Sequence, residues 1–205
     1  MTARECYFAM DQHLMQDVEP SSYLEAISIT PVFDEYPFSL LKKLKDTEQS
    51  PKHHPEGNVW NHTMLVVDEG AKVKGKSKDP RAFMWAALLH DIGKPSTTKV
   101  RKGRITAYHH EKEGEFIARG FLKEFTEDDA FIDSVAYLIR WHMQVLFVVN
   151  GLPFADIQSM KEQTDLYEVA LLGQCDRLGR LDVDRIEIEK EMEQFIKICT
   201  REVID

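Results

Sequence analysis

Residues 84 to 96 read M-W-A-A-L-L-H-D-I-G-K-P-S, which places a histidine and an aspartate directly after an apolar run. Burying a polar or charged side chain without a partner costs roughly 2 to 7 kcal/mol. His90 and Asp91 therefore need something inside the fold that satisfies them, and a metal ion is one such partner. A chain with this stretch has to fold so that the partner reaches both residues.

The same stretch has the start and stop signals of a buried helix. Asp79-Pro80 is typical of an N-cap followed by proline at the first helical position, and Gly93 marks the end of the apolar run. Apolar residues lie on nearly every side in between, which is typical of a central helix covered by its neighbours. His90 and Asp91 thus fall in the last turn of that helix.

Helix signals dominate the rest of the chain and strand signals are few, so we expect an all-α fold. Thr126 with Asp129 three residues later gives a capping-box signal. The charged segment 99–108 is expected to form a small hairpin or an ordered loop. The expected helices cover about 58–73, 80–92, 110–125, 127–143, 165–176 and 183–203, with two short ones starting near residues 21 and 37.

The overall charge limits the class of partner. With 35 acidic and 26 basic residues the formal net charge is −9, which argues against a protein that coats nucleic acid. Two local basic stretches, 72–78 and 99–104, are either solvated segments or a surface for RNA contact. The cysteines lack C-x-x-C spacing, which favours a reducing compartment. The sequence contains no run of about 18 apolar residues, so no membrane span is expected. We therefore expect a cytoplasmic protein with no membrane partner.

Five helix positions carry a metal-ligand type of side chain on the apolar face: His62, His90, His110, His142 and Asp176. Any one of them alone would more often be a hydrogen-bonded core residue. Five together favour a metal cage of nitrogen and oxygen ligands drawn from several helices. The other histidines lack such a position and are not placed in the site: His13, His53, His54 and His109.

The pattern of His62, His90-Asp91 and Asp176 resembles the HD domain superfamily of metal-dependent phosphohydrolases. The chain is most similar to the HD domain attached to bacterial CCA-adding tRNA nucleotidyltransferases. The motifs that carry this resemblance are H-P-E-G-N-V-W-N-H-T at 54–63, L-L-H-D-I-G-K-P at 88–95, H-H-E-K-E-G at 109–114, L-I-R-W-H at 138–142 and C-D-R-L-G-R at 175–180. We expect the upstream 50 residues to be too few for a nucleotidyltransferase head, so CCA addition is not implied.

The resemblance implies an all-α helical bundle with a metal site between its central helices. We expect one HD-type domain over residues 1–205. Its core would cover about 50–182, preceded by a helical extension at 1–49 and followed by a C-terminal helix at 183–205.

By the same resemblance, one divalent ion is held by His62, His90, Asp91 and Asp176, and Asp91 bridges to a second ion held by His110 and His142. Mg, Mn, Fe, Co and Ni all stay open, since divalent sites with nitrogen and oxygen ligands follow metal availability as well as geometry. Cations close to these ligands in the sequence either bind phosphate oxygens or are surface charges: Lys94, Arg140 and Arg180. Glu56 is either an acid beside the substrate or a turn residue.

The activity implied is that of a metal-dependent phosphohydrolase, a phosphatase or phosphodiesterase, in which metal-bound hydroxide attacks a small phosphate ester. A nucleotide monophosphate or a 2′,3′-cyclic nucleotide is the expected substrate, with Asp91 and Lys94 as catalytic residues. Two alternatives stay open. Four histidines and two aspartates also suit a di-iron oxygenase on the same scaffold, and a nucleotide- or RNA-binding module would keep the metal without turnover.

The C-terminal helix leaves the oligomeric state open. Its apolar stripe packs either on the core of its own chain or on a second copy: Ile188, Met192, Phe195, Cys199 and Val203.

Overall fold

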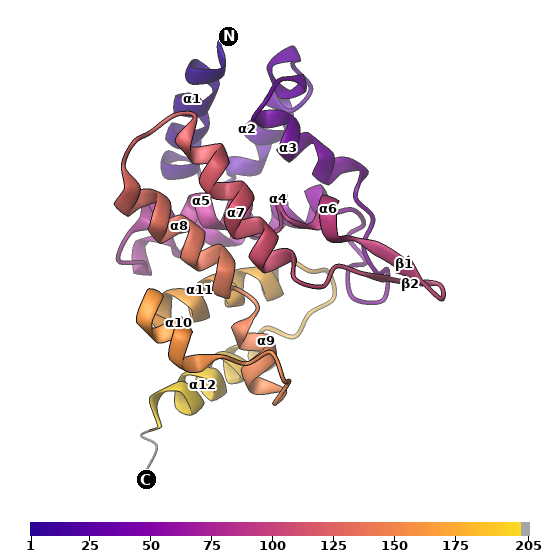
Figure 1. The fold of residues 1–205 in the computed structure, drawn as a ribbon, viewed down its shortest axis with the longest axis vertical. Helices are drawn as coiled ribbons and strands as arrows, with labels where there is room; N and C mark the ends of the chain where they lie inside the picture. Colours follow the sequence, from indigo (N-terminus) through magenta and orange to yellow (C-terminus); the bar gives the residue numbers. More distant parts are fainter. Residues whose placement is uncertain (202–205) are drawn as a thin grey trace.

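The computed structural model describes residues 1–201 and consists of helices with one two-stranded hairpin (Figure 1). The all-α prediction is confirmed. The elements are α1 (Ala3–Gln16), α2 (Pro20–Ile27), α3 (Phe38–Lys42), α4 (Val59–Val73), α5 (Pro80–Leu89), α6 (Lys94–Thr97), β1 (Lys99–Arg101), β2 (Arg104–Thr106), α7 (His110–Lys123), α8 (Asp129–Trp141), α9 (Gln144–Val149), α10 (Ile157–Gln163), α11 (Leu166–Leu178) and α12 (Arg185–Thr200).

Helix α5 is the central helix that its sequence predicts. The Asp79 side chain accepts a hydrogen bond from the backbone N–H of Ala82 and so caps the helix start. Every residue from Ala82 to Leu89 is buried, because α5 packs against α1, α4, α8 and α11. The helix end is covered as well, and His90 and Asp91 are each 1% exposed.

The turn after α5 approaches α7 at backbone distance. A Cβ atom on Gly93 would lie 2.2 Å from the carbonyl oxygen of His110 and 2.6 Å from the backbone nitrogen of Gly114. Only glycine leaves room for this contact. A Cβ on Gly114 would in turn lie 3.1 Å from Ile139 of α8. The two glycines therefore bring α7 and α8 against the turn that carries Asp91.

The N-terminal segment packs on the same core. Helix α1 begins with a capping box between Thr2 and Glu5, which the sequence analysis did not identify. The Tyr7 ring stacks on Trp85 of α5 and on Phe125, with ring centroids 4.8 Å and 4.5 Å apart. Residues 1–49 therefore share buried contacts with α5. The division into a core and two extensions stays a prediction.

Several helix boundaries differ from the sequence expectation. Helix α5 ends at Leu89, so His90 is its C-cap and Asp91 lies in the following turn rather than in the last turn of the helix. Helix α8 is capped by Asp128, whose side chain accepts from the N–H of Phe131, so the capping box at Thr126 and Asp129 was wrong. Thr126 instead accepts from the N–H of Asp128 in the preceding turn. The helix also ends one residue before His142, and α9 starts two residues after it.

The segment Asp129–Val149, which holds α8 and α9, is long and apolar enough to cross a membrane by length and composition alone. No such run was expected from the sequence. In the structure more than half of the segment is buried, and it packs on α5, α7, α11 and α12. Its apolar composition is thus that of a core element.

Helix α12 packs on α9 and α11, and the stripe of Ile188, Met192, Phe195 and Cys199 is buried in the chain's own core. This decides between the two packings left open above. Val203 and the end of the expected helix lie outside the described residues.

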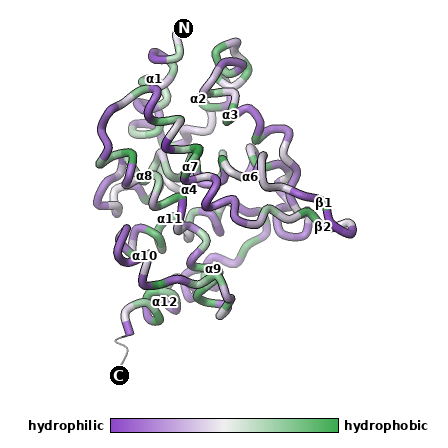
Figure 2. The backbone as a smooth tube through the Cα atoms, in the orientation of Figure 1, coloured by the Kyte–Doolittle hydropathy of each residue, from purple (hydrophilic) through white to green (hydrophobic). Residues whose placement is uncertain are grey.

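The β1–β2 hairpin projects from the side of the bundle (Figure 1). Lys102 and Gly103 take positive φ values of 49° and 74°, as a two-residue hairpin turn requires. Hydrophilic residues cover much of the hairpin and the surface loops, as Figure 2 shows.

Candidate metal centre

Two helices end at a histidine, and the helix end fixes the orientation of each ring. His90 caps α5 and donates from Nδ1 to the carbonyl of Ala87 at 2.9 Å, and His142 caps α8 and donates from Nδ1 to the carbonyl of Ile139 at 2.7 Å. Carbonyls in the last turn of a helix have no partner within the helix. Because a carbonyl oxygen can only accept, Nδ1 must carry the hydrogen. In the neutral ring Nε2 then keeps a free lone pair.

His110 reaches the same state at the start of α7. Its Nδ1 donates to the carbonyl of Ala107 at 2.7 Å. His109, which directly precedes His110, has a φ of 65°, the left-handed conformation that residues other than glycine rarely adopt. This turn aims the His110 ring into the protein with its Nε2 lone pair foremost.

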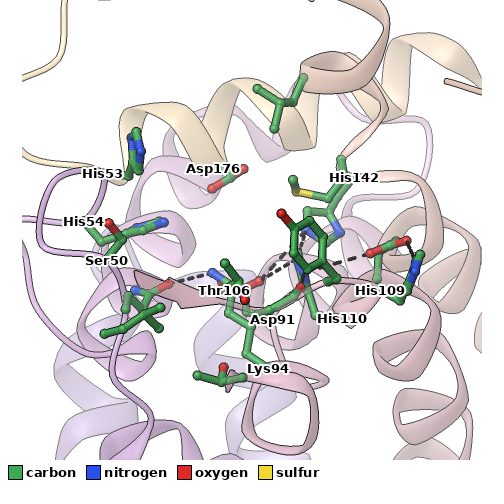
Figure 3. A pocket seen from close by; sticks show the side chains of 18 of the residues that line it. Ser50, His53, His54, Asp91, Lys94, Thr106, His109, His110, His142 and Asp176 are labelled. Atoms are coloured by element: carbon green, nitrogen blue, oxygen red, sulfur yellow. Dashed lines mark hydrogen bonds and ion pairs between the residues drawn. The ribbon is translucent and has the colours of Figure 1, made fainter. Parts of the chain in front are cut away.

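The three Nε2 atoms converge on one carboxylate. Asp91 lies 3.2 Å from Nε2 of His90, 3.3 Å from Nε2 of His110 and 4.0 Å from Nε2 of His142. Figure 3 shows Asp91, His110 and His142 directed into a common space, with Asp176 nearby. A carboxylate among imidazole lone pairs is a donor set for a divalent metal ion.

The distance between the His110 and His142 rings shows whether a metal ion would fit between them. Their Nε2 atoms are 3.2 Å apart. Burial lowers the pKa of His110 to about 3 and also lowers the pKa of His142, so a proton is not held between them. Two nitrogens about 2.1 Å from a shared ion lie about 3.2 Å apart when they subtend roughly 100°. The pair therefore fits a cation.

His62 enters the same space from α4. Its Nε2 lies 3.0 Å from Asp176 of α11, and its Nδ1 lies 3.0 Å from Glu56. Burial lowers the pKa of His62, but the two carboxylates outweigh burial and leave this pKa above its ordinary value. Glu56 therefore orients the His62 ring from behind, as carboxylates commonly do for metal-binding histidines.

The potential ligands form two groups that share Asp91. One ligand atom each from His62, His90 and Asp91 lies within 4.8 Å of the other two, and the same holds for Asp91, His110 and His142. Asp176 joins the first group through His62. All six side chains are buried, and for the five other than Asp91 the predicted position on an apolar helix face agrees with this burial. Their assignment as ligands stays a prediction.

Asp91 is ionised in this environment. Burial raises the pKa of Asp91, but its contacts with His90 and Lys94 outweigh burial and hold the pKa well below its usual range. The Nζ atom of Lys94 lies 2.6 Å from Asp91. The carboxylate thus stays charged and available to a cation at any pH near neutrality.

A cavity of about 590 Å³ opens onto this centre and is lined by Asp91, Lys94, His110, His142, Asp176 and Arg180. Gln49 also lines it and was missed by the sequence analysis. Its Oε1 accepts from Lys94 at 2.6 Å, and its Nε2 makes no hydrogen bond to any of residues 1–201. Lysine can only donate, so the oxygen must face Lys94 and the amide N–H₂ is left free.

Arg180 and Arg140 are placed differently. Arg180 lines the cavity 3.4 Å from Asp176, and within the described chain its Nε atom has no hydrogen-bond partner. Arg140 does not line the cavity. Its guanidinium lies over the Trp141 ring and 3.8 Å from Glu115, because its position in α8 turns it away from His142. The geometry therefore supports phosphate contact for Arg180 and not for Arg140.

Histidines left out of the site by the sequence analysis lie near it: His53, His54 and His109 line the cavity (Figure 3). His54 donates to Glu56 at 2.8 Å, and burial with nearby Lys94 lowers the pKa of His54 to about 4. Glu56 itself is almost fully buried behind both rings, and it does not line the cavity. These residues sit in loops, where no helical period shows which way a side chain points.

The two basic stretches, 72–78 and 99–104, differ in how far acidic residues pair with their cations. In 72–78, Lys72 pairs with Glu69, Lys78 pairs with Asp165, and Lys74 donates to backbone carbonyls. In the hairpin, the cations Lys99, Arg101, Lys102 and Arg104 form no ion pair with any other described residue. Lys76 is the exception in 72–78, since it is exposed and makes no ion pair with another described residue. Of the two stretches the hairpin therefore carries more uncompensated positive charge, and its base continues into the cavity wall through Ile105 and Thr106.

Comparison with known proteins identifies the domain that contains this cluster. The HD domain model matches residues 59–180. A "Multifunctional CCA protein" of Actinobacillus pleuropneumoniae serotype 5b is 30% identical over 148 residues, which cover 69% of the chain and 34% of the relative. The protein of the same name from Halorhodospira halophila is 37% identical over 95 residues, which cover 46% of the chain and 21% of the relative. The chain thus spans about a third or less of the length of these curated relatives.

Proposed function

The chain belongs to the HD domain family, and from this membership and its buried histidine and aspartate cluster we propose that it is a metal-dependent phosphohydrolase acting on a small phosphate ester. One observation carries the proposal. At the wall of one cavity, Oδ1 of Asp91 faces Nε2 of His110 and His142, and Oδ2 of Asp91 faces Nε2 of His90 and the ammonium of Lys94. Ligands for a cation and donors for an anion therefore face the same space.

One or two divalent ions would be held by the two groups that share Asp91, with His62, His90 and Asp176 on one side and His110 and His142 on the other. When bound, such an ion lowers the pKa of a coordinated water and offsets the charge that builds on phosphoryl oxygens. The carbonyls of Ala87, Ala107 and Ile139 keep the histidine rings in the tautomer that leaves Nε2 free.

The remaining polar groups suit a phosphate. The Lys94 ammonium, the Gln49 amide and the Arg180 guanidinium all line the cavity, and they would donate to phosphoryl oxygens. Hydrolysis adds one water across the P–O bond: hydroxyl goes to phosphorus and a proton to the leaving oxygen. These donors bind and orient the ester, and they stabilise its negative charge. They also favour a phosphohydrolase over the oxygenase alternative, whose substrate need not be an anion.

The proposed substrate is a nucleotide monophosphate or a 2′,3′-cyclic nucleotide, which follows from the motif resemblance. The proposed location is the cytoplasm, in keeping with Cys6, Cys175 and Cys199, which are free and buried. CCA addition by the longer relatives is not carried over, since only about a third of their length is matched.

RNA is a second proposed partner, and the hairpin supports it. Arg101 lies directly opposite Arg104 in the β1–β2 register, and like charges in that position repel. A phosphate between them would relieve the repulsion.

We expect Arg101→Gln to weaken the binding of a short single-stranded RNA and to reduce the salt dependence of that binding by about one counterion. Turnover of a small ester should be unchanged. Equal RNA binding by both proteins would exclude this contact.

The test of the proposed activity is a hydrolysis panel with metal-stripped protein that is resupplied with single divalent ions. The panel compares 2′,3′-cyclic nucleotides, 2′-, 3′- and 5′-monophosphates and a generic phosphodiester. Restored cleavage of one ester class by one or more ions supports the proposal. If metal is bound and every ester stays intact, the hydrolase assignment is wrong, and oxygen consumption with iron becomes the next assay.

A further inference from the structure

The cavity beside Asp91 has two chemically different ends. One end carries the charged and polar groups described above. The other is lined mainly by apolar and aromatic side chains: Tyr108, Met143, Leu146, Phe147, Leu152 and Phe154. A volume of about 590 Å³ is typical of a site for a whole small molecule rather than for a phosphate alone. If the phosphate lies at the polar end, as the proposed function requires, the apolar end faces the organic part of the ester.

Two aromatic side chains that line this end are exposed to solvent. Tyr108 is 62% exposed and Phe154 is 47% exposed. Single exposed aromatic residues are common on protein surfaces. Here both line one cavity next to a cluster of potential metal ligands, which is where a ligand would cover them.

Phe154 is held in place by the structure around it. Gln144 is buried, and its side chain donates to the carbonyl of Phe154 at 3.2 Å and accepts from the N–H of Asp156 at 2.9 Å. The Phe154 ring contacts Phe147 at a centroid distance of 5.4 Å and His109 at 6.2 Å. A loop residue fixed in this way presents a preformed aromatic surface.

Tyr108 is connected to the candidate metal centre through the backbone turn that leads to His110. It stands two residues before His110, and the left-handed turn at His109 separates the two. The bond from His110 to the carbonyl of Ala107 closes this turn across Tyr108. Strained conformations of this kind persist where the surrounding structure fixes them, often at binding sites. The turn thus directs His110 inward and leaves Tyr108 at the cavity mouth.

We propose that Tyr108 and Phe154 bind the base of a nucleotide whose phosphate lies beside Lys94. A base offers two flat apolar faces to aromatic rings and keeps its polar edges free for water or for side chains at the rim. The phosphate and the base then occupy the two ends of one cavity. Tyr108 and Phe154 determine the preference for nucleotides over other phosphate esters, and they are tolerant of base identity because every base has such a face.

The test compares binding of matched pairs with and without a base. Metal-loaded protein is titrated with adenosine 5′-monophosphate and ribose 5-phosphate, and with the corresponding 3′-phosphates, for wild type, Tyr108→Ala and Tyr108→Phe. Stacking on an aromatic side chain contributes about 1 to 3 kcal/mol per base, which corresponds to about fivefold to a hundredfold in affinity. Tyr108→Ala should weaken nucleotide binding by that factor and leave ribose phosphate binding unchanged, and Tyr108→Phe should restore it.

The matched control is Phe116→Ala, since Phe116 is an exposed aromatic residue that does not line the cavity. Equal affinity for nucleotide and ribose phosphate, or an equal loss for both in Tyr108→Ala, would overturn the base site. Failure of the hydrolase proposal gives a different result. In that case the binding difference persists while no ester is turned over.

Discussion

The Nε2 atoms of His110 and His142 lie 3.2 Å apart, while the Nδ1 atom of each ring donates to a backbone carbonyl. The backbone therefore fixes both rings so that two lone pairs face each other. Burial lowers the pKa of both imidazoles, so a proton does not bridge them near neutral pH. A cation between the rings would account for this arrangement, and this gives the first prediction.

His142→Ala should lower the number of divalent ions bound per chain by about one. The variant removes one nitrogen from the group of Asp91, His110 and His142, and it leaves His62, His90 and Asp91 in place. The measurement is elemental analysis after equilibration with Mn²⁺ and removal of free ion. His13→Ala is the control, because His13 pairs with Asp17 away from the centre. Loss of no ion would show that His142 is not a ligand.

Gln49→Met should raise the KM for the phosphate ester by about tenfold to somewhat more than a hundredfold. The variant keeps the side-chain length but removes the free amide donor, and a lost hydrogen bond to a charged group costs about 1.5 to 3 kcal/mol. Steady-state kinetics with the best ester of the panel measures the effect. Gln158→Met on the exposed side of α10 should leave KM unchanged. An unchanged KM in Gln49→Met would place the substrate away from this amide.

Gly93→Ala should destabilise the protein by about 1 to 3 kcal/mol or more, because its Cβ would overlap the backbone of α7. Since α7 carries His110, we expect weaker metal binding as well. Urea unfolding with and without metal measures both effects. Gly75→Ala has open space around its Cβ and should change stability by no more than about 0.5 kcal/mol. Equal stability of the two variants would contradict the close approach of α7.

Tyr7 links the N-terminal segment to the core, and we propose that residues 1–205 form one domain. Burial raises the pKa of Tyr7 to about 12, so the folded state favours the neutral phenol. Its contribution to stability is full below the ordinary pKa of about 10 and is lost as pH rises from about 10 to 12. Tyr7→Phe should therefore lose less stability than wild type over this range in urea unfolding. A parallel pH dependence of both proteins would show that Tyr7 is not buried on the core.

Much of the fold and of the cluster could be predicted because both depend on helical periodicity. The apolar face of each helix predicted that His62, His90, His110, His142 and Asp176 point inward, and burial of these side chains agrees. The N-cap and proline at 79–80 fixed the start of α5. These are local rules, and they act within a few residues.

What the sequence did not reveal lies in loops and long-range contacts. Gln49 lies in a loop and reaches the cavity through Lys94, 45 residues away. His54 lies beside His62 because Oε1 of Glu56 is within 3.0 Å of a ring nitrogen of each. Arg140 was expected near phosphate because it precedes His142 by two residues, yet two residues along a helix is a rotation of about 200°, which turns the side chain away. No period in the sequence reports these relationships.

The most direct test of the central claim is turnover by Asp91→Asn. The substitution keeps the shape of the side chain and removes the charge shared by both ligand groups. With the ion and ester that give the highest rate, we expect kcat/KM to fall by more than about a thousandfold, since metal-ion catalysis contributes several kcal/mol. Asp129→Asn, an exposed aspartate at the start of α8, should retain the wild-type rate. If Asp91→Asn is folded, binds metal and turns over the ester at the wild-type rate, the proposed metal-dependent hydrolysis at this centre is wrong.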